Sequence, residues 1–197
     1  MKIYDISQEV FSSCVYPGDP SPSARKLSDM SAGALYNLTE FTMCAHNGTH
    51  VDAPSHFIDG AETVDALDLS HLVGKAYVAH FNGILTATDA NELLDKAEKS
   101  SKDASKRLLI KGDATVTEEA AEAMIERGIF LIGVESQSVG PIDAPMATHK
   151  LLLGAKVVLL EGIQLTNVPE GEFLLCAAPI NLGGLDGAPC RALLIEL

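Results

Sequence analysis

The chain has 197 residues, of which 47% are hydrophobic and 21% are charged, a composition typical of a soluble globular domain. Acidic residues outnumber basic residues 27 to 14, which gives a formal net charge of −13. Such a surface repels phosphate backbones and anionic lipids, because both are bound by clustered Lys and Arg side chains. The composition therefore argues against nucleic acid and membrane surfaces as partners.

The start of the chain shows no targeting segment. The first ten residues, MKIYDISQEV, contain three charged side chains and no long apolar run, so they do not resemble a signal peptide. The longest apolar stretches, at 129–134 and 157–160, are too short to span a bilayer. The four cysteines, at positions 14, 44, 176 and 190, have no CxxC spacing and fit a reducing compartment. We therefore expect a cytoplasmic protein in which residues 1–197 form a single domain.

The N-terminal half is predicted to be rich in strands. Residues 2–10 are predicted to form an opening strand, and the Pro- and Gly-rich residues 16–23 an exposed loop. Residues 36–45 contain β-forming side chains with partial alternation and predict another strand. This strand leads directly into a cluster of histidines.

The second half alternates between helices and strands. Residues 88–99 are predicted to form a helix with Asp89 as its N-cap, and residues 117–128 a helix that Gly128 ends. A third helix is predicted at 146–154. Apolar runs predict strands at 107–112, 130–134, 155–162, 173–180 and 190–197. Together these elements predict an α/β fold, a single domain built on a mixed sheet with flanking helices.

Residues 46–56, HNGTHVDAPSH, hold three of the six histidines in the chain. In an extended segment His46, His50 and Asp52 point to one side, because they share parity. His56 has the same parity and lies beyond Pro54. Two imidazoles and a carboxylate form a ligand set suited to Zn²⁺ or Mn²⁺, and three protein ligands leave a position open for water. The segment therefore predicts a catalytic metal site.

Two alternative interpretations of the histidines are weaker. A helical HExxH site is disfavoured, because Asn47 stands where that motif has glutamate and because Gly48 and Pro54 oppose a helix interior. Scattered histidines without a ligand role are the better interpretation for His71 and His80, which have no metal-binding neighbours in the sequence.

The sequence HNGTHVDAPSHF resembles the HxGTHxDxPxHF signature of the metal-dependent cyclase-like hydrolases, a family that includes bacterial kynurenine formamidase and isatin hydrolase. The resemblance extends over almost the whole chain. It includes the turn YPGD at 16–19, the segment 131–163 with a histidine and, twelve residues later, a glutamate, and the C-terminal residues 177–197.

This resemblance implies a set of metal ligands. It implies that His46, His50 and Asp52 hold one divalent ion, and that Asp52 bridges to a second ion completed by His149 and Glu161. One or two ions per chain are therefore expected, either Zn or Mn. The implied fold is an α/β domain around a mixed, barrel-like sheet, assembled as a homodimer or a higher homo-oligomer.

The resemblance also implies a reaction, in which metal-activated water hydrolyses an amide bond other than a peptide bond. His56 corresponds to the general acid/base of the family, and Tyr16 takes the place of an aromatic residue that lies beside the substrate. N-formylkynurenine is the leading substrate candidate. Kynurenine formamidases commonly have tryptophan where this chain has Tyr16, and an Asp-Thr pair where it has Glu135 and Ser136.

These departures suggest a differently shaped or more polar pocket, to which Gln137 and Ser138 also contribute. A hydrolase of a cyclic amide or a lactone is therefore the first alternative, since it would use the same metals and the same His56. The second is a non-catalytic metal-binding module. The substrate under each enzymatic interpretation is a small molecule.

Overall fold

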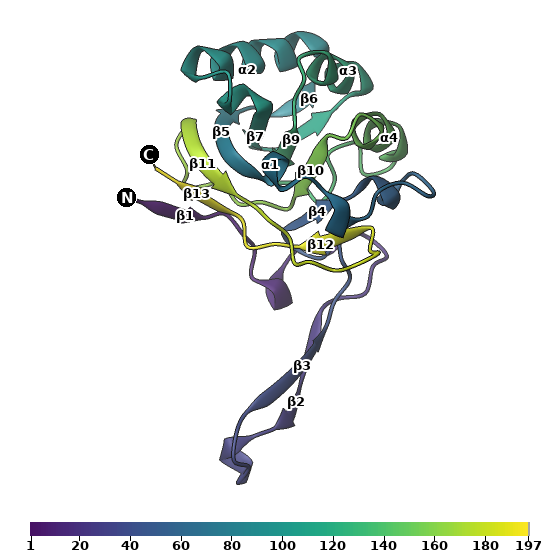
Figure 1. The fold of residues 1–197 in the computed structure, drawn as a ribbon, viewed down its shortest axis with the longest axis vertical. Helices are drawn as coiled ribbons and strands as arrows, with labels where there is room; N and C mark the ends of the chain where they lie inside the picture. Colours follow the sequence, from purple (N-terminus) through teal and green to yellow (C-terminus); the bar gives the residue numbers. More distant parts are fainter. Residues whose placement is uncertain (197) are drawn as a thin grey trace.

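The computed structural model describes residues 1–196, which form a curled nine-stranded sheet, four α-helices and a long hairpin (Figure 1). The α-helices are α1 (Leu69–Leu72), α2 (Ala87–Ser100), α3 (Glu118–Glu126) and α4 (Met146–Gly154). The strands of the main sheet are β1 (Ile3–Asp5), β4 (His50–Asp52), β5 (Val73–His80), β7 (Arg107–Lys111), β9 (Leu131–Val134), β10 (Val158–Glu161), β11 (Gly171–Cys176), β12 (Gly187–Pro189) and β13 (Leu193–Ile195). Two further pairs are β2 (Ser23–Ser28) with β3 (Leu38–Thr42), and β6 (Gly83–Leu85) with β8 (Ala114–Val116).

The main sheet has the order β1-β13-β11-β5-β7-β9-β10-β4-β12. Its central strands β5, β7, β9 and β10 are parallel neighbours, whereas the strands on both sides pair antiparallel. Helices α2, α3 and α4 cover one face of the curled sheet (Figure 1). The predicted fold class, α/β around a mixed, barrel-like sheet with flanking helices, is confirmed.

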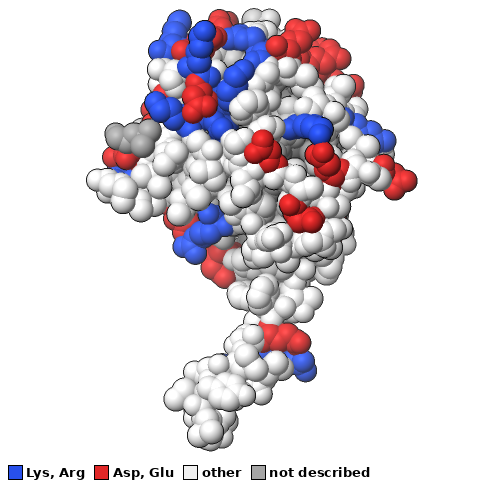
Figure 2. All heavy atoms as spheres, in the orientation of Figure 1, with Lys and Arg blue, Asp and Glu red and all other residues white. Residues whose placement is uncertain are grey.

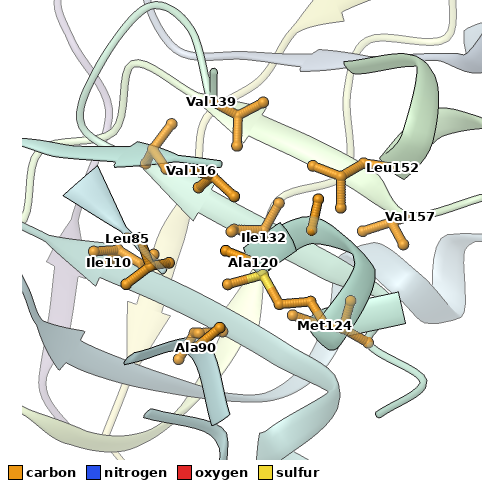
Figure 3. Packing of buried hydrophobic residues seen from close by; sticks show 14 of the residues in the cluster. Leu85, Ala90, Ile110, Val116, Ala120, Met124, Ile132, Val139, Leu152 and Val157 are labelled. Atoms are coloured by element: carbon orange, nitrogen blue, oxygen red, sulfur yellow. The ribbon is translucent and has the colours of Figure 1, made fainter. Parts of the chain in front are cut away.

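Apolar residues bury both faces of the central strands. On β7, Leu108 and Ile110 belong to the core beneath the helices, while Leu109 belongs to the core on the opposite face. On β10, Leu159 and Leu160 divide in the same way. Continuous apolar runs are typical of strands that are covered on both sides, which explains why the sequence shows them without alternation. Figure 3 shows part of the core beneath the helices, where Met124 of α3 packs near other buried side chains.

Some element boundaries differ from the predictions. The opening strand is limited to β1, and a 3₁₀ turn, Val10–Ser12, follows it. Helix α2 begins earlier than predicted, because Thr86 is its N-cap and Asp89 is the third helical residue of a reciprocal capping box. The prediction of Asp89 as the N-cap was therefore wrong by one turn. Among residues 1–196, no helix combines the length and apolar character that a bilayer crossing requires.

Candidate metal centre

The centre of the histidine cluster is strand β4, which lies between β10 and β12 in the sheet. Antiparallel pairing places His50 opposite Glu161 of β10, so these side chains share a face of the sheet. His149 comes from α4, the helix that precedes β10. His46 precedes β4 in a turn, and His56 ends the 3₁₀ turn Pro54–His56 that follows it.

Two glycines, Gly48 and Gly187, shape the backbone around His46 and His50. Gly48 has φ +66°, a left-handed conformation that favours glycine. Gly187 of β12 lies against the ring of His46, where an added Cβ would be 2.6 Å from Cε1 of that ring. Small residues at these two positions therefore let the backbone pass beside the histidines.

Asp52 occupies the middle of the cluster, and its two oxygens face different histidines. Oδ1 lies 2.9 Å from His46 Nδ1 and 3.4 Å from His50 Nε2. Oδ2 lies 3.8 Å from His149 Nε2 and, among residues 1–196, has no hydrogen-bond partner although it is buried. Glu161 lies 3.5 Å from His50 Nε2 through Oε2 and 3.3 Å from His149 Nε2 through Oε1. The structure thus brings all five residues predicted as metal ligands together.

The backbone fixes which nitrogen of two histidines faces this cluster. His50 Nδ1 lies 3.0 Å from the carbonyl oxygen of Gly48, and His149 Nδ1 lies 2.7 Å from that of Pro145. Because a carbonyl can only accept, Nδ1 carries the proton in both rings, and in the neutral ring Nε2 keeps its lone pair. Such outer hydrogen bonds are typical of metal-binding histidines.

The spacing of these atoms fits a divalent cation. Atoms held about 2.1 Å from a tetrahedral ion lie about 3.4 Å from one another. The separations of His50 Nε2 and His149 Nε2 from the facing oxygens of Asp52 and Glu161 range from 3.3 to 3.8 Å. The Nε2 lone pair of a neutral histidine and a carboxylate oxygen repel each other at this distance unless a positive charge lies between them. Together with the unpartnered oxygen of Asp52, this donor set supports a bound divalent metal.

The pKa values of His50 and Asp52 also indicate that the cluster favours a positive charge. Burial disfavours a charge on His50, yet its contacts with Asp52 and Glu161 outweigh burial and raise its pKa to about 10. Burial also acts to raise the pKa of Asp52, but the contacts with His46 and His50 lower it well below the ordinary value. The carboxylates therefore attract either protons on the histidines or a cation.

Asp186, in the loop before β12, links two histidines at the edge of the cluster. Its Oδ2 lies 2.9 Å from His46 Nε2 and 3.2 Å from His56 Nδ1. The rings of His46 and His56 stack with their centroids 3.9 Å apart. Burial lowers the pKa of His56, although the nearby Asp52 and Asp186 act in the opposite direction. Asp186 does not stand out in the sequence as a site residue, because an aspartate among Gly and Pro residues is typical of a turn.

A cavity of about 510 Å³ opens onto the cluster, a size that suits a small molecule. Tyr16 lies in its wall, where the hydroxyl group donates a hydrogen bond of 2.7 Å to the carbonyl oxygen of Ile142. Cys44, Gln137 and Ser138 also line this cavity. His71 and His80 lie outside it: His71 stacks on Phe130 at 4.4 Å, and His80 contacts Asn82.

Glu135 does not line this cavity, in contrast to the role suggested by its place in the sequence. Its two carboxylate oxygens accept hydrogen bonds of 2.7 Å each from the backbone N–H groups of Gly112 and Leu165. It therefore joins two loops at the ends of the sheet strands. Gln137 and Ser138, by contrast, line the cavity, as the sequence predicted.

We expect Glu135→Ala to reduce stability without changing catalysis. Leaving two backbone donors without their carboxylate partner costs about 1–3 kcal/mol, which urea unfolding monitored by circular dichroism measures. Ser138→Ala, which changes the cavity wall, serves as the comparison. An increase in KM for Glu135→Ala with unchanged stability would contradict this assignment.

Comparisons with known proteins agree with the resemblance seen in the sequence. A family profile described as "putative cyclase" matches residues 4–141. The kynurenine formamidase of Salinibacter ruber is 33% identical over 215 aligned positions, which cover 98% of this chain and 97% of the relative. The kynurenine formamidase of Polaromonas naphthalenivorans is 30% identical and aligns with 100% of this chain and 92% of its own.

Solved structures show the same architecture. A potential metal-dependent hydrolase with cyclase activity superposes with a TM-score of 0.83 at 28% identity, covering 98% of this chain and 96% of the other. Isatin hydrolase A from Labrenzia aggregata has the same fold, with a TM-score of 0.84 at 23% identity and coverage of 100% and 94%. The chain belongs to the cyclase family, and the resemblance identified from its sequence is confirmed.

Proposed function

We propose that this protein is a metal-dependent hydrolase of amide bonds other than peptide bonds, with N-formylkynurenine as the leading substrate candidate. The observation that carries the proposal is the buried cluster around Asp52, beneath a cavity of small-molecule size, in which one oxygen of Asp52 has no hydrogen-bond partner within residues 1–196. The similarity of nearly the whole chain to kynurenine formamidases supports the same reaction class.

In this proposal His46, His50 and Asp52 would hold one ion, and Asp52, His149 and Glu161 would hold a second. Imidazole and carboxylate ligands suit Zn²⁺ and Mn²⁺, and we propose one or two such ions per chain. Two groups of donor atoms, both including Asp52, lie close enough for this arrangement. The backbone N–H of Val139 donates a hydrogen bond of 2.6 Å to Glu161 and so orients that ligand.

When bound, a divalent ion would polarise the amide carbonyl and lower the pKa of water far below its ordinary value, toward about 7. The residues of the chain supply the remaining steps. His56 protonates the departing nitrogen from Nε2, because Asp186 occupies its Nδ1. Tyr16 packs beside the substrate in the cavity wall, where its hydroxyl is held by the carbonyl oxygen of Ile142.

The choice of substrate within this class depends on the cavity wall. Tyr16 and Gln137 line the cavity, and Gln137 carries two buried polar atoms that have no partner among residues 1–196. This more polar wall favours, as the second candidate, a hydrolase of a cyclic amide or a lactone. The proposal further includes a homodimer or higher homo-oligomer, a cytoplasmic location that the four free thiols support, and one hydrolase domain over residues 1–197.

We expect protein purified without chelators to contain Zn or Mn by elemental analysis and to release formate from N-formylkynurenine. His50→Ala should lose both the metal and the activity, while His71→Ala, a matched change at a ring stacked on Phe130, should lose neither. Bound metal without release of formate would favour the second candidate, a hydrolase of cyclic amides or lactones. Wild-type protein that binds no metal, even after reconstitution, would falsify the proposed function.

A further inference from the structure

Residues 16–19, with the sequence YPGD, form a turn in the wall of the cavity above the metal centre, and Tyr16 and Asp19 at its two ends line that cavity. The backbone N–H of Asp19 donates a hydrogen bond of 3.0 Å to the carbonyl oxygen of Tyr16 and closes the turn. Gly18 has φ +102°, a positive value of the kind that a type II turn requires at its third residue, and Pro17 suits the second. The sequence therefore preorganises this turn.

The turn is anchored to the loop that leads into α4. The hydroxyl group of Tyr16 donates a hydrogen bond of 2.7 Å to the carbonyl oxygen of Ile142 in that loop. Asp19 is exposed, whereas the candidate metal ligands His149 and Glu161, which line the same cavity, are buried. The carboxylate of Asp19 therefore lies at the solvent-facing mouth of the cavity, and the metal centre lies at its floor.

Asp19 differs from the two other carboxylates that line the cavity, Glu161 and Asp186. Glu161 and Asp186 each contact two histidines of the cluster. Asp19 makes no ion pair with any residue of the described range 1–196, and its side chain is exposed. A bound divalent ion would also be balanced by Glu161 at the floor rather than by Asp19. The negative charge of Asp19 is therefore free to interact with a bound substrate.

Within residues 1–196, no lysine or arginine lines the cavity. On the face shown in Figure 2, basic side chains gather mainly over α2, at the end of the molecule opposite the β2–β3 hairpin, and four lysines lie between residues 96 and 106. The cavity lies at the root of this hairpin, since Asp19 precedes β2, Cys44 follows β3 and both line it. The net charge of −13 adds a field of the same sign as Asp19. The mouth of the cavity therefore attracts cations and repels anions.

We propose that Asp19 is a specificity-determining residue, which selects amides that carry a positive charge, such as a primary ammonium group, outside the bond that is hydrolysed, and disfavours amides that are anionic there. This selection rests on the proposed hydrolase function. N-formylkynurenine fits it, because its ammonium group can pair with Asp19 while its carboxylate remains in solvent. A solvent-exposed ion pair of this kind changes affinity by about fivefold at most, so the preference is moderate.

Three formanilides with the same ring test this selection. They carry a meta-aminomethyl, a meta-methyl or a meta-carboxylate group, and are therefore cationic, neutral and anionic at neutral pH. In the metal-loaded wild type, kcat/KM should be up to about fivefold higher for the cationic than for the neutral formanilide, and lowest for the anionic one. The ratio between substrates is compared within each variant, so a general change in activity cancels.

Asp19→Asn should lose most of the preference for the cationic formanilide, and Asp19→Lys should reverse the order of the three substrates. Metal content and circular dichroism equal to those of the wild type should show that both variants are folded. Glu118→Gln, which removes one exposed carboxylate at the first residue of α3, should keep the wild-type order. A wild type without the preference, or an Asp19→Asn variant that keeps it in full, overturns the proposal.

Ketones that cannot be hydrolysed separate this proposal from the proposed function. The acetophenones with the same aminomethyl and methyl groups have no amide bond, and calorimetry gives their Kd values with the metal-loaded protein. The cationic ketone should bind the wild type up to about fivefold more tightly than the neutral ketone, and Asp19→Asn should bind the two about equally. If no formanilide is hydrolysed but this difference is found, the proposed function fails and the selection by Asp19 stands. Equal Kd values in the wild type, without hydrolysis, overturn both.

Discussion

Asp52→Asn is expected to empty the metal centre and to lower kcat/KM on the order of a thousandfold or more. Asp52 is the one residue common to the two central groups of donor atoms, one with His46 and His50 and the other with His149 and Glu161. An amide has the same shape as a carboxylate but no negative charge, so it cannot balance ions held by its neighbours. Loss of metal polarisation costs several kcal/mol of transition-state stabilisation, and each 1.4 kcal/mol is about tenfold in rate.

Elemental analysis of metal per chain, together with hydrolysis rates, checks this expectation. Glu161→Gln is the informative comparison, because it removes a carboxylate from the second group alone and should reduce metal content without abolishing it. Asp59→Asn changes an exposed carboxylate near the same segment and should leave both readings unchanged. Full metal content in Asp52→Asn would contradict the bridging role.

The local part of this centre could be predicted from the sequence. His50 and Asp52 share parity within β4, where period-two geometry places both side chains on one side. His46 precedes β4 in a turn, so the turn rather than parity brings its side chain to the cluster. The buried central strands could be predicted in the same way, because their apolar runs are covered on both faces. Residues 146–154 form α4 with the predicted bounds. In each case the information lies within one element.

The long-range part of the centre could not be derived from spacing. Glu161 faces His50 because β10 pairs with β4 in a particular register. The two residues are more than one hundred positions apart, and nothing in the sequence between them indicates this register. Only the family resemblance pointed to His149 and Glu161. Asp186 was missed for the same reason, since its contacts with His46 and His56 cross 140 and 130 residues respectively.

Strand β2 and the longest strand, β5, were missed for a different reason, whereas β3 lies within the predicted strand 36–45. The segment that forms β2 alternates charged, polar and small residues without a buried face, so it gives no signal of an element that packs in its own chain. Strand β5 contains Gly74, over which the guanidinium group of Arg107 packs, and a glycine followed by a lysine weakens a strand pattern. Strand β5 depends on its partners β7 and β11, which are distant in sequence.

His56→Ala is expected to lower kcat by about 10²–10⁴-fold and to leave the metal content unchanged. The rings of His46, His50 and His149 each contact the buried carboxylate of Asp52 or Glu161, whereas His56 makes its carboxylate contact with Asp186, which is half-exposed at the edge of the cluster. A ring held in this way through Nδ1 can exchange a proton at Nε2. Asp186→Asn should therefore reproduce part of the loss, because it disturbs the orientation of His56 while leaving the ring in place.

Metal content and the pH profile separate the two roles that this geometry allows. His46, His56 and Asp186 also lie close enough to hold an ion themselves, and in that case His56→Ala would release metal together with activity. If His56 transfers a proton, the variant keeps its metal. The pH profile of kcat/KM then loses one ionisation, because that ionisation reports the imidazole of His56 in the free enzyme. His80→Ala, a change at an exposed histidine, controls for nonspecific effects. The stacking of His56 on His46 rather than among the carboxylates of Asp52 and Glu161 favours proton transfer.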